Sequence, residues 1–225
     1  MMLHSRIPLL LAGILAFVGS LSQDADAAVV TTQEASLNSI FSQGSFAADP
    51  IGFRFNASIT IIDPDLTTID SSAEFSTLGS LASGPSSTIQ LFYVDAINWC
   101  GSPGTNIVGC GANPGNLIVL NSLAAAHPLY GPELIAHEMG HNLGLGHTGG
   151  AGLMGPMLNL DTSLSAAEVT TIRSSPLVQL DALGYYINVT PVLVQATAVP
   201  EPGSLALLTL FGVVFCVVRR RRVRR

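Results

Sequence analysis

Residues 136–147 read A-H-E-M-G-H-N-L-G-L-G-H, and this stretch limits the fold more than any other part of the sequence. His137 and His141 are four residues apart, so on a helix both imidazoles project from one face, about one turn apart. Two imidazoles in that arrangement can bind one metal ion. His147 would lie about 15 Å farther along the axis if the helix continued. Gly144 can adopt a positive φ and turn the chain, which brings His147 back towards the other two histidines.

This pattern predicts a catalytic zinc site with one coordination position left open for water. The predicted zinc ligands are His137, His141 and His147, three of only five histidines in 225 residues. Glu138 follows the first ligand, where its carboxylate can act as general base on a zinc-activated water that attacks a substrate carbonyl. The alternative interpretation is a protein that binds zinc here and catalyses nothing.

The residues before the motif indicate where its helix begins. Pro132 is typical of the first turn of a helix, where its missing N–H costs no hydrogen bond. Glu133 places a negative charge near the positive end of the helix dipole. We therefore expect the helix to begin within residues 128–136.

The H-E-x-x-H-x-x-G-x-x-H spacing of residues 137–147 resembles the long zinc motif of the metzincin metalloendopeptidases. Met154, in the sequence Leu-Met-Gly-Pro, resembles the methionine of the metzincin Met-turn. The resemblance implies that Met154 forms a hydrophobic base beneath the zinc and is not a ligand. It also implies an α+β fold with an α/β-like upper subdomain, in which a twisted mixed sheet carries the active-site helix, and a small helical C-terminal subdomain.

The sequence departs from the family after the predicted Met-turn. Some metzincins have a tyrosine there that stabilises the transition state, whereas this chain has Gly-Pro-Met at 155–157. Tyr185 and Tyr186 are far away in the sequence, and we expect both to pack in the core. Stabilisation of the oxyanion would then depend mainly on zinc.

The N-terminus has the features of a secretory signal peptide. A short basic start precedes an apolar run, which ends in Ala25-Asp26-Ala27. We expect cleavage after Ala27, so that residues 1–27 are removed during export.

The C-terminus resembles the PEP-CTERM sorting signal of Gram-negative bacteria. Val199-Pro200-Glu201-Pro202 precedes an apolar stretch at 204–218 and a cluster of six arginines. The stretch is slightly short for a transmembrane helix, and the arginines can extend it by snorkelling. The resemblance implies a transient anchor in the inner membrane, recognition by an exosortase, and delivery to the cell surface or extracellular matrix. A plain C-terminal membrane anchor is the alternative.

Residues 28–198 remain as the mature part, which has the length of one domain with a substantial core. This part contains twelve acidic residues and two basic residues, Arg54 and Arg173, and therefore has a net charge of −10. So strong a negative charge argues against nucleic acid as a partner.

Cys100 and Cys110 are separated by a Gly- and Pro-rich loop that is easily closed. Export to an oxidising compartment permits a disulfide between them, and we predict one.

The segment Asp63-Pro64-Asp65, together with Asp70, has two interpretations. It has carboxylates that could bind calcium, as some metzincins do. A solvated turn explains the same residues and is the interpretation that we favour.

Hydrophobic alternation predicts a strand at Phe53–Ile62, and mostly apolar runs predict strands at Thr88–Ile97 and Asn116–Leu120. In the first of these, alternation places Phe53 and Ile61 on the same face. The resemblance to metzincins implies an edge strand above the cleft that pairs with an extended substrate, and Thr105–Gly109 is the candidate for it. A short helix is predicted within 71–84, and the capping box Ser165-x-x-Glu168 predicts another through Ser174. Residues 28–50 are expected to lie on the surface, and residues 178–194 to close the fold.

Taken together, these features predict a secreted zinc-dependent endopeptidase that acts on protein or peptide substrates. Two alternatives remain at this stage. One is a surface or matrix protein that keeps zinc for stability, and the other is an amidase that acts on cell-wall peptides.

Overall fold

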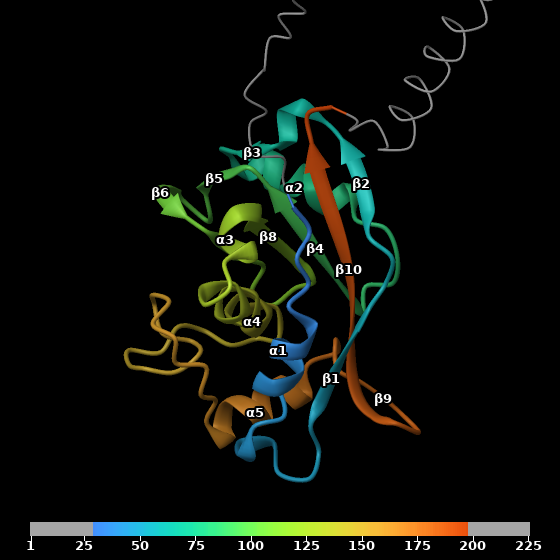
Figure 1. Ribbon diagram of the computed structural model, residues 1–225, viewed down its shortest axis with the longest axis vertical. Coiled ribbons are helices and arrows are strands. Elements are labelled where there is room, and N and C mark those ends of the chain that lie inside the picture. The colour runs from blue at the N-terminus through green and yellow to red at the C-terminus, as the bar shows by residue number, and fades with distance from the viewer. Residues whose placement is uncertain (1–28, 198–225) are drawn as a thin grey trace, which may run out of the picture.

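A twisted mixed sheet forms the framework of the protein (Figure 1). The computed structural model describes residues 29–197. Neighbouring strands follow the order β1 (Ile51–Phe55), β10 (Gly184–Gln195), β4 (Thr88–Val94), β8 (Leu117–Asn121) and β7 (Gly109–Gly111). The first four are parallel, and β7 is antiparallel to β8. Beside β10 lie also β2 (Ile59–Ile62), which is parallel, and β9 (Gln179–Asp181), which is antiparallel.

Helices cover both faces of this sheet, so the strands are buried on both sides. One face packs against α1 (Glu34–Ile40), α3 (Ser122–Ala126), α4 (Tyr130–Asn142) and α5 (Ala166–Ser174). The other packs against α2 (Ser72–Leu81) and a small sheet of β3 (Thr68–Ile69), β5 (Ala96–Trp99) and β6 (Pro103–Ile107). Two short 3₁₀-helices, η1 (Gly44–Phe46) and η2 (Pro64–Leu66), complete the structure. The fold is thus α+β with a mixed sheet, as predicted.

The predicted strand Phe53–Ile62 is divided into β1 and β2, and this corrects the expected single face. Phe55 lies opposite Val189 and Ile59 opposite Val192, so β1–β2 has one residue more than β10 over this span. An extra residue reverses the alternation of side chains. Phe53 therefore packs in the core beside α4, whereas Ile61 packs on the opposite face of the sheet.

The expectation that residues 28–50 lie on the surface is wrong. Leu37, Phe41 and Phe46 are fully buried, and the ring of Phe41 meets that of Phe53 edge-on at 4.9 Å. Most residues of this segment are small or polar, which hides its core contribution in the sequence. Its few large apolar side chains lie together on one face of α1 and the turn after it.

Both helices predicted outside the zinc motif are present. The helix expected within 71–84 is α2, and Ser71 and Glu74 form a capping box at its start. The capping box of Ser165 and Glu168 opens α5 as predicted. In each box the serine hydroxyl accepts a backbone N–H, while the glutamate accepts the N–H of the serine.

The chain returns to the interior of the sheet after α5. Residues 178–194 were expected to close the fold, and they do so as β9 and β10, which lies between β1 and β4. Along β10, Ile187 and Val189 are buried against the α4 face, while Val192 and Val194 are buried against the α2 face. The region after the zinc motif therefore contributes one helix, α5, and a strand, β10, that pairs with β1, β2, β4 and β9.

Both ends of the described chain lie at the same end of the molecule, the upper end in Figure 1. Within residues 29–197, no helix has both the length and the apolar character needed to cross a membrane. The helix predicted at 204–218 lies outside the described residues, as do the predicted signal peptide and the Pro-Glu-Pro segment.

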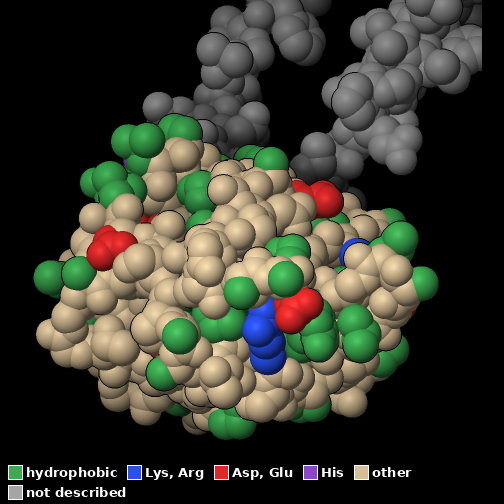
Figure 2. All heavy atoms as spheres, turned by 90° about the horizontal axis from the view of Figure 1, so that it is seen from below, with side chains coloured by type: hydrophobic (Ala, Val, Ile, Leu, Met, Phe, Trp, Pro, Cys, Tyr) green, Lys and Arg blue, Asp and Glu red, His purple; other side chains and the backbone are tan. Residues whose placement is uncertain are grey.

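Charged side chains are sparse on the opposite, lower end of the molecule, where uncharged polar groups and scattered apolar side chains predominate (Figure 2). The two arginines of residues 29–197 each lie beside a carboxylate. Arg54 contacts Asp181 at 2.7 Å, and Arg173 lies 3.9 Å from Asp49.

We predict that a chain ending at Leu183 does not fold, whereas residues 29–197 fold alone. The shorter chain lacks β10, which supplies the hydrogen-bonding partner of β1, β2 and β4 and buries side chains on both faces. Circular dichroism during heating compares the two proteins. A cooperative unfolding transition in the shorter chain would show that β10 is dispensable.

Candidate active site

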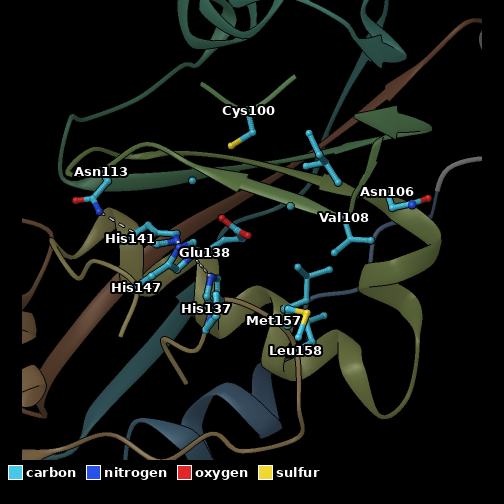
Figure 3. Close-up of a pocket in the computed structure, with 15 residues that line it drawn as sticks. Cys100, Asn106, Val108, Asn113, His137, Glu138, His141, His147, Met157 and Leu158 are labelled. Atoms are coloured by element: carbon cyan, nitrogen blue, oxygen red, sulfur yellow. Dashed lines mark hydrogen bonds between the residues drawn. The ribbon is translucent and has the colours of Figure 1, made fainter. Parts of the chain in front are cut away.

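The zinc motif lies on α4 and on the turn after it, and it brings three imidazoles together (Figure 3). His137 and His141 project from the same side of the helix. Nε2 of His147 lies 3.2 Å from Nε2 of His137 and 3.2 Å from Nε2 of His141. The ligand atoms of all three residues lie within 4.8 Å of one another.

Hydrogen bonds at the opposite ring nitrogen fix how two of these imidazoles are protonated. Nδ1 of His137 lies 2.7 Å from the carbonyl oxygen of Leu153, and Nδ1 of His141 lies 2.9 Å from that of Leu145. A carbonyl oxygen can only accept, so each Nδ1 carries the proton and each Nε2 presents a lone pair. Burial lowers the pKa values of both rings, which favours the neutral form that binds metals.

The arrangement of the three Nε2 atoms fits a zinc ion. Two of them present lone pairs to His147, and a single proton on His147 could satisfy only one of the two contacts. A cation satisfies all three nitrogens at once. Tetrahedral zinc with Zn–N distances of about 2.0–2.1 Å separates its ligand nitrogens by about 3.3 Å, close to the observed 3.2 Å.

Gly144 makes the turn that the sequence predicted. The helix α4 ends at Asn142, and Gly144 has a φ of +95°, a conformation that L-residues with side chains rarely adopt. The N–H of Leu145 donates to the carbonyl of Gly140, which closes the helix end. From there the chain runs back, so that His147 faces the helix.

Met154 is completely buried against the zinc helix. A side chain added at Gly140 would collide with the sulfur of Met154, so a glycine at this position of the motif lets the methionine pack against the helix. The next residue back, Leu153, accepts the hydrogen bond of His137. Met154 thus packs against α4 one residue after the carbonyl that orients His137.

Glu138 is almost fully buried beside the imidazoles, and its carboxyl lies close to β7. Burial raises the pKa of this carboxyl to about 7, partly opposed by a hydrogen bond from the backbone of Gly111. A carboxyl that titrates near neutral pH can both accept and release a proton at that pH.

Two glycines let β7 approach the zinc helix. A Cβ at Gly109 would lie 2.5 Å from the Glu138 carboxylate, and one at Gly111 would lie 2.7 Å from the Glu138 carbonyl oxygen. Between them, Cys110 faces the other way and forms the predicted disulfide with Cys100. The alternation Gly-Cys-Gly is a period-two pattern that could have identified this strand from the sequence.

The edge strand expected at Thr105–Gly109 is therefore displaced. Residues up to Ile107 form β6 and pair with β5 in the small sheet, while β7 begins at Gly109 and pairs with β8. Asn106 has a positive φ of 60° just before the change of sheet. The disulfide ties the end of β5 to the middle of β7 across this change.

A cleft of about 550 Å³ opens over the imidazoles. Val108 lies on one side of the cleft, and Met157 and Leu158 lie on the other (Figure 3). The glycines of β7, which follow Val108, and Pro156, which precedes Met157, also line the cleft. Apart from Glu138 and the three histidines, the lining side chains are uncharged. The lining residues include no tyrosine, and Tyr185 and Tyr186 lie half-buried at the start of β10.

Two asparagines that the sequence analysis did not single out support the site. Nδ2 of Asn113 donates to the Leu145 carbonyl at 2.7 Å, the same oxygen that accepts from His141. Nδ2 of Asn142 donates to the carbonyls of Ala112 and Leu117, which ties the end of α4 to the β7–β8 turn. Neither residue carries a sequence signal for this role.

The aspartates considered for calcium have local partners. Oδ1 of Asp63 accepts the N–H of Asp65 at the start of η2, and Oδ1 of Asp70 accepts from Asn98. Among the described residues, the potential metal-binding group that the structure brings together consists of the three histidines.

We predict that Gly111→Ala destabilises the protein by about 1–3 kcal/mol, the usual effect of overpacking. The new Cβ meets a backbone oxygen of α4, so the strand and the helix must separate. Gly146→Ala is the matched control, because nothing lies within 4 Å of a Cβ there. Urea unfolding measures both variants, and equal stabilities would show that β7 is not tightly packed on α4.

The pKa of Glu138 predicts a pH-dependent effect in the metal-free protein. The folded value of about 7 lies above the ordinary 4.5, so the folded state binds the proton more tightly. Stability is therefore lost as pH rises from 4.5 to 7, by about 3 kcal/mol for a shift of this size. Glu138→Gln carries no such charge. In chelator-treated protein we expect it to melt higher than wild type at pH 8, with a smaller difference at pH 5.

Comparison with known families agrees with this geometry. Residues 86–148 match the family model described as metallo-peptidase family M12B, reprolysin-like. This match runs from just before β4 to Thr148, directly after His147, and covers less than a third of the chain. Residues 198–222 match the PEP-CTERM protein-sorting motif. No curated protein matches the sequence. These matches bear out both resemblances stated from the sequence: residues 86–148 are similar to a reprolysin-like metallopeptidase, and residues 198–222 to the PEP-CTERM sorting motif.

Proposed function

We propose that this protein is a secreted zinc endopeptidase of metzincin type, with His137, His141 and His147 as metal ligands. The convergence of three Nε2 atoms on a point open to the cleft carries this proposal. A structural zinc site normally has four protein ligands and no access, whereas a catalytic site has three and an open position. The three histidines and the cleft correspond to the second kind.

Glu138 is the proposed general base and, later, the general acid. Bound zinc would polarise the scissile carbonyl and increase the acidity of a water molecule. Glu138 takes the proton of that water and passes it to the leaving amine, and a pKa of about 7 suits both transfers at neutral pH. The glycines of β7 leave room for this carboxylate, since a side chain at either position would displace it.

The substrate is proposed to bind in an extended conformation along β7. Val108 and Ala112 use their backbone groups to pair with β8, as does Cys110 opposite Val119. In an antiparallel pair the intervening residues point their N–H and C=O groups the other way. The backbone of Gly109 is thus available to a peptide strand added at the edge. The uncharged walls of the cleft favour apolar and uncharged side chains next to the scissile bond.

The protein's own residues supply no tyrosine hydroxyl for the oxyanion among the described cleft-lining groups. We therefore propose that stabilisation of the oxyanion rests mainly on the metal. Met154 is proposed to act only as a rigid base, since it is fully buried and packs on Gly140.

The chain is proposed to be organised for export in three parts. Residues 1–27 are a signal peptide, 28–198 the peptidase domain, and 199–225 a sorting signal with a membrane helix at 204–218 that an exosortase recognises. The match of residues 198–222 to the sorting motif supports the third part, and so does the end of β10 at Gln195, directly before it. Such a signal places the protein at the surface or in the matrix of a Gram-negative bacterium.

We predict that Glu138→Gln leaves zinc binding unchanged and lowers peptidase activity by about a thousandfold, within the usual range for loss of a general base. Glutamine keeps the size of the side chain and cannot take up the proton. Bound zinc, measured by atomic absorption, and cleavage of denatured casein compare the variant with wild type after export to the periplasm.

Other outcomes would favour the alternatives. Protein that binds no zinc would contradict the proposal outright. One equivalent of zinc without cleavage of casein by wild type would favour a stabilising zinc site. Cleavage of muropeptides in place of casein would favour an amidase that acts on the cell wall.

A further inference from the structure

Glu133 lies one turn before His137 on α4 and is buried, with 2% of its surface exposed. From the sequence, this residue was expected to serve the helix dipole. Its carboxylate instead accepts two backbone hydrogen bonds from a distant segment, the N–H groups of Asn159 and Leu160, both at 2.8 Å. Each oxygen takes one bond, so the carboxylate holds two consecutive residues.

No cation accompanies this buried carboxylate among the described residues, whose two arginines contact Asp181 and Asp49. Burial of a carboxylate is unfavourable unless hydrogen bonds replace its hydration. The N–H groups of Asn159 and Leu160 supply those bonds. These hydrogen bonds therefore stabilise the buried carboxylate and, at the same time, hold the segment in place.

The segment held by Glu133 contains one wall of the cleft. Residues 148–165 form neither helix nor strand, so no regular backbone hydrogen bonding holds them, and buried side chains such as Met154 and individual hydrogen bonds fix their position. Two of the attachments are to α4. His137 binds the carbonyl of Leu153, and Glu133, one turn earlier, binds Asn159 and Leu160. The wall residues 156–158 lie between these attachments and face the cleft.

We propose that Glu133 is a positioning residue that fixes the wall 156–158 relative to the metal ligands. It thereby sets the width of the cleft between this wall and Val108, and with it the affinity for the substrate side chain next to the metal. This inference rests on the proposed peptidase function. It assigns Glu133 a role in substrate binding. Metal binding remains with the three histidines, and proton transfer with Glu138.

Gln43 provides a matched control on the same segment, beyond the wall. Its Nε2 donates to the carbonyl of Thr162 at 3.0 Å, and its Oε1 accepts the N–H of Leu164 at 3.1 Å. In Glu133→Gln, the new side-chain NH₂ faces a backbone N–H, so two donors meet. In Gln43→Glu, a carboxylate oxygen faces the carbonyl of Thr162, so two acceptors meet. Each change keeps the shape of the side chain and disrupts its attachment to residues 148–165.

The test compares two hydroxamates on zinc-loaded exported protein. Acetohydroxamate reaches the metal only, whereas a peptide hydroxamate with a leucine side chain also contacts the wall. We expect Glu133→Gln to weaken the peptide hydroxamate about tenfold, the effect of losing one buried hydrogen bond, with acetohydroxamate within about twofold of wild type. Gln43→Glu should leave both affinities unchanged, and peptide cleavage by Glu133→Gln should show a raised KM with little change in kcat.

Hydrogen exchange gives a readout that needs neither metal nor activity. Glu133→Gln should accelerate exchange of the amides of Asn159 and Leu160 at least tenfold, while Gln43→Glu leaves them slow. Unchanged exchange, equal losses for both hydroxamates, or the same KM increase in Gln43→Glu would overturn the role of Glu133. A wild type that binds both hydroxamates and cuts no peptide would count against the proposed function alone.

Discussion

The meeting of three imidazole nitrogens is the constraint on which the rest of this structure depends. Nε2 of His147 lies 3.2 Å from Nε2 of both helical histidines, and the two helical rings carry their protons on the far side. Three nitrogens held in this way repel one another unless a cation lies between them. The fold must therefore hold the rings before the ion binds, and α4 has hydrogen-bonded or close-packed neighbours along most of its length.

Those neighbours come from both sides of α4 in the sequence, some next to the helix and some far from it. The carbonyls of Leu145 and Leu153 orient two rings, and Asn113 donates to the first of these carbonyls. The strand β7 packs on Glu138 through Gly109 and Gly111, which removes water from the carboxyl and raises its pKa. One helix thus carries two of the proposed metal ligands and the proposed base, while the surrounding backbone determines their protonation and orientation.

The sequence predicted the elements of the fold better than their arrangement. The capping boxes of α2 and α5 were predicted from local chemistry, because a serine and a glutamate three residues apart bond only to their own helix. The strand at 53–62 was misjudged, since the extra residue between Phe55 and Ile59 is visible only against its partner β10. The position of β10 between β1 and β4 could not be predicted, because strand pairing depends on contacts far apart in the sequence.

By itself, the sequence determined the candidate site and the C-terminal motif: three histidines, a glutamate and a turning glycine at spacings that only a helix followed by a reversal can satisfy, and a PEP-CTERM sorting motif. These features lie within short stretches, so local geometry fixes them. Only the tertiary structure decided what surrounds them. Three sets of contacts join segments 16 to 29 residues apart. They are the packing of the β7 glycines on Glu138, the hydrogen bond of His137 to the Leu153 carbonyl, and the hydrogen bonds of Glu133 to residues 159 and 160. Contacts over such separations depend on how helix, sheet and loop pack together, which no local pattern records.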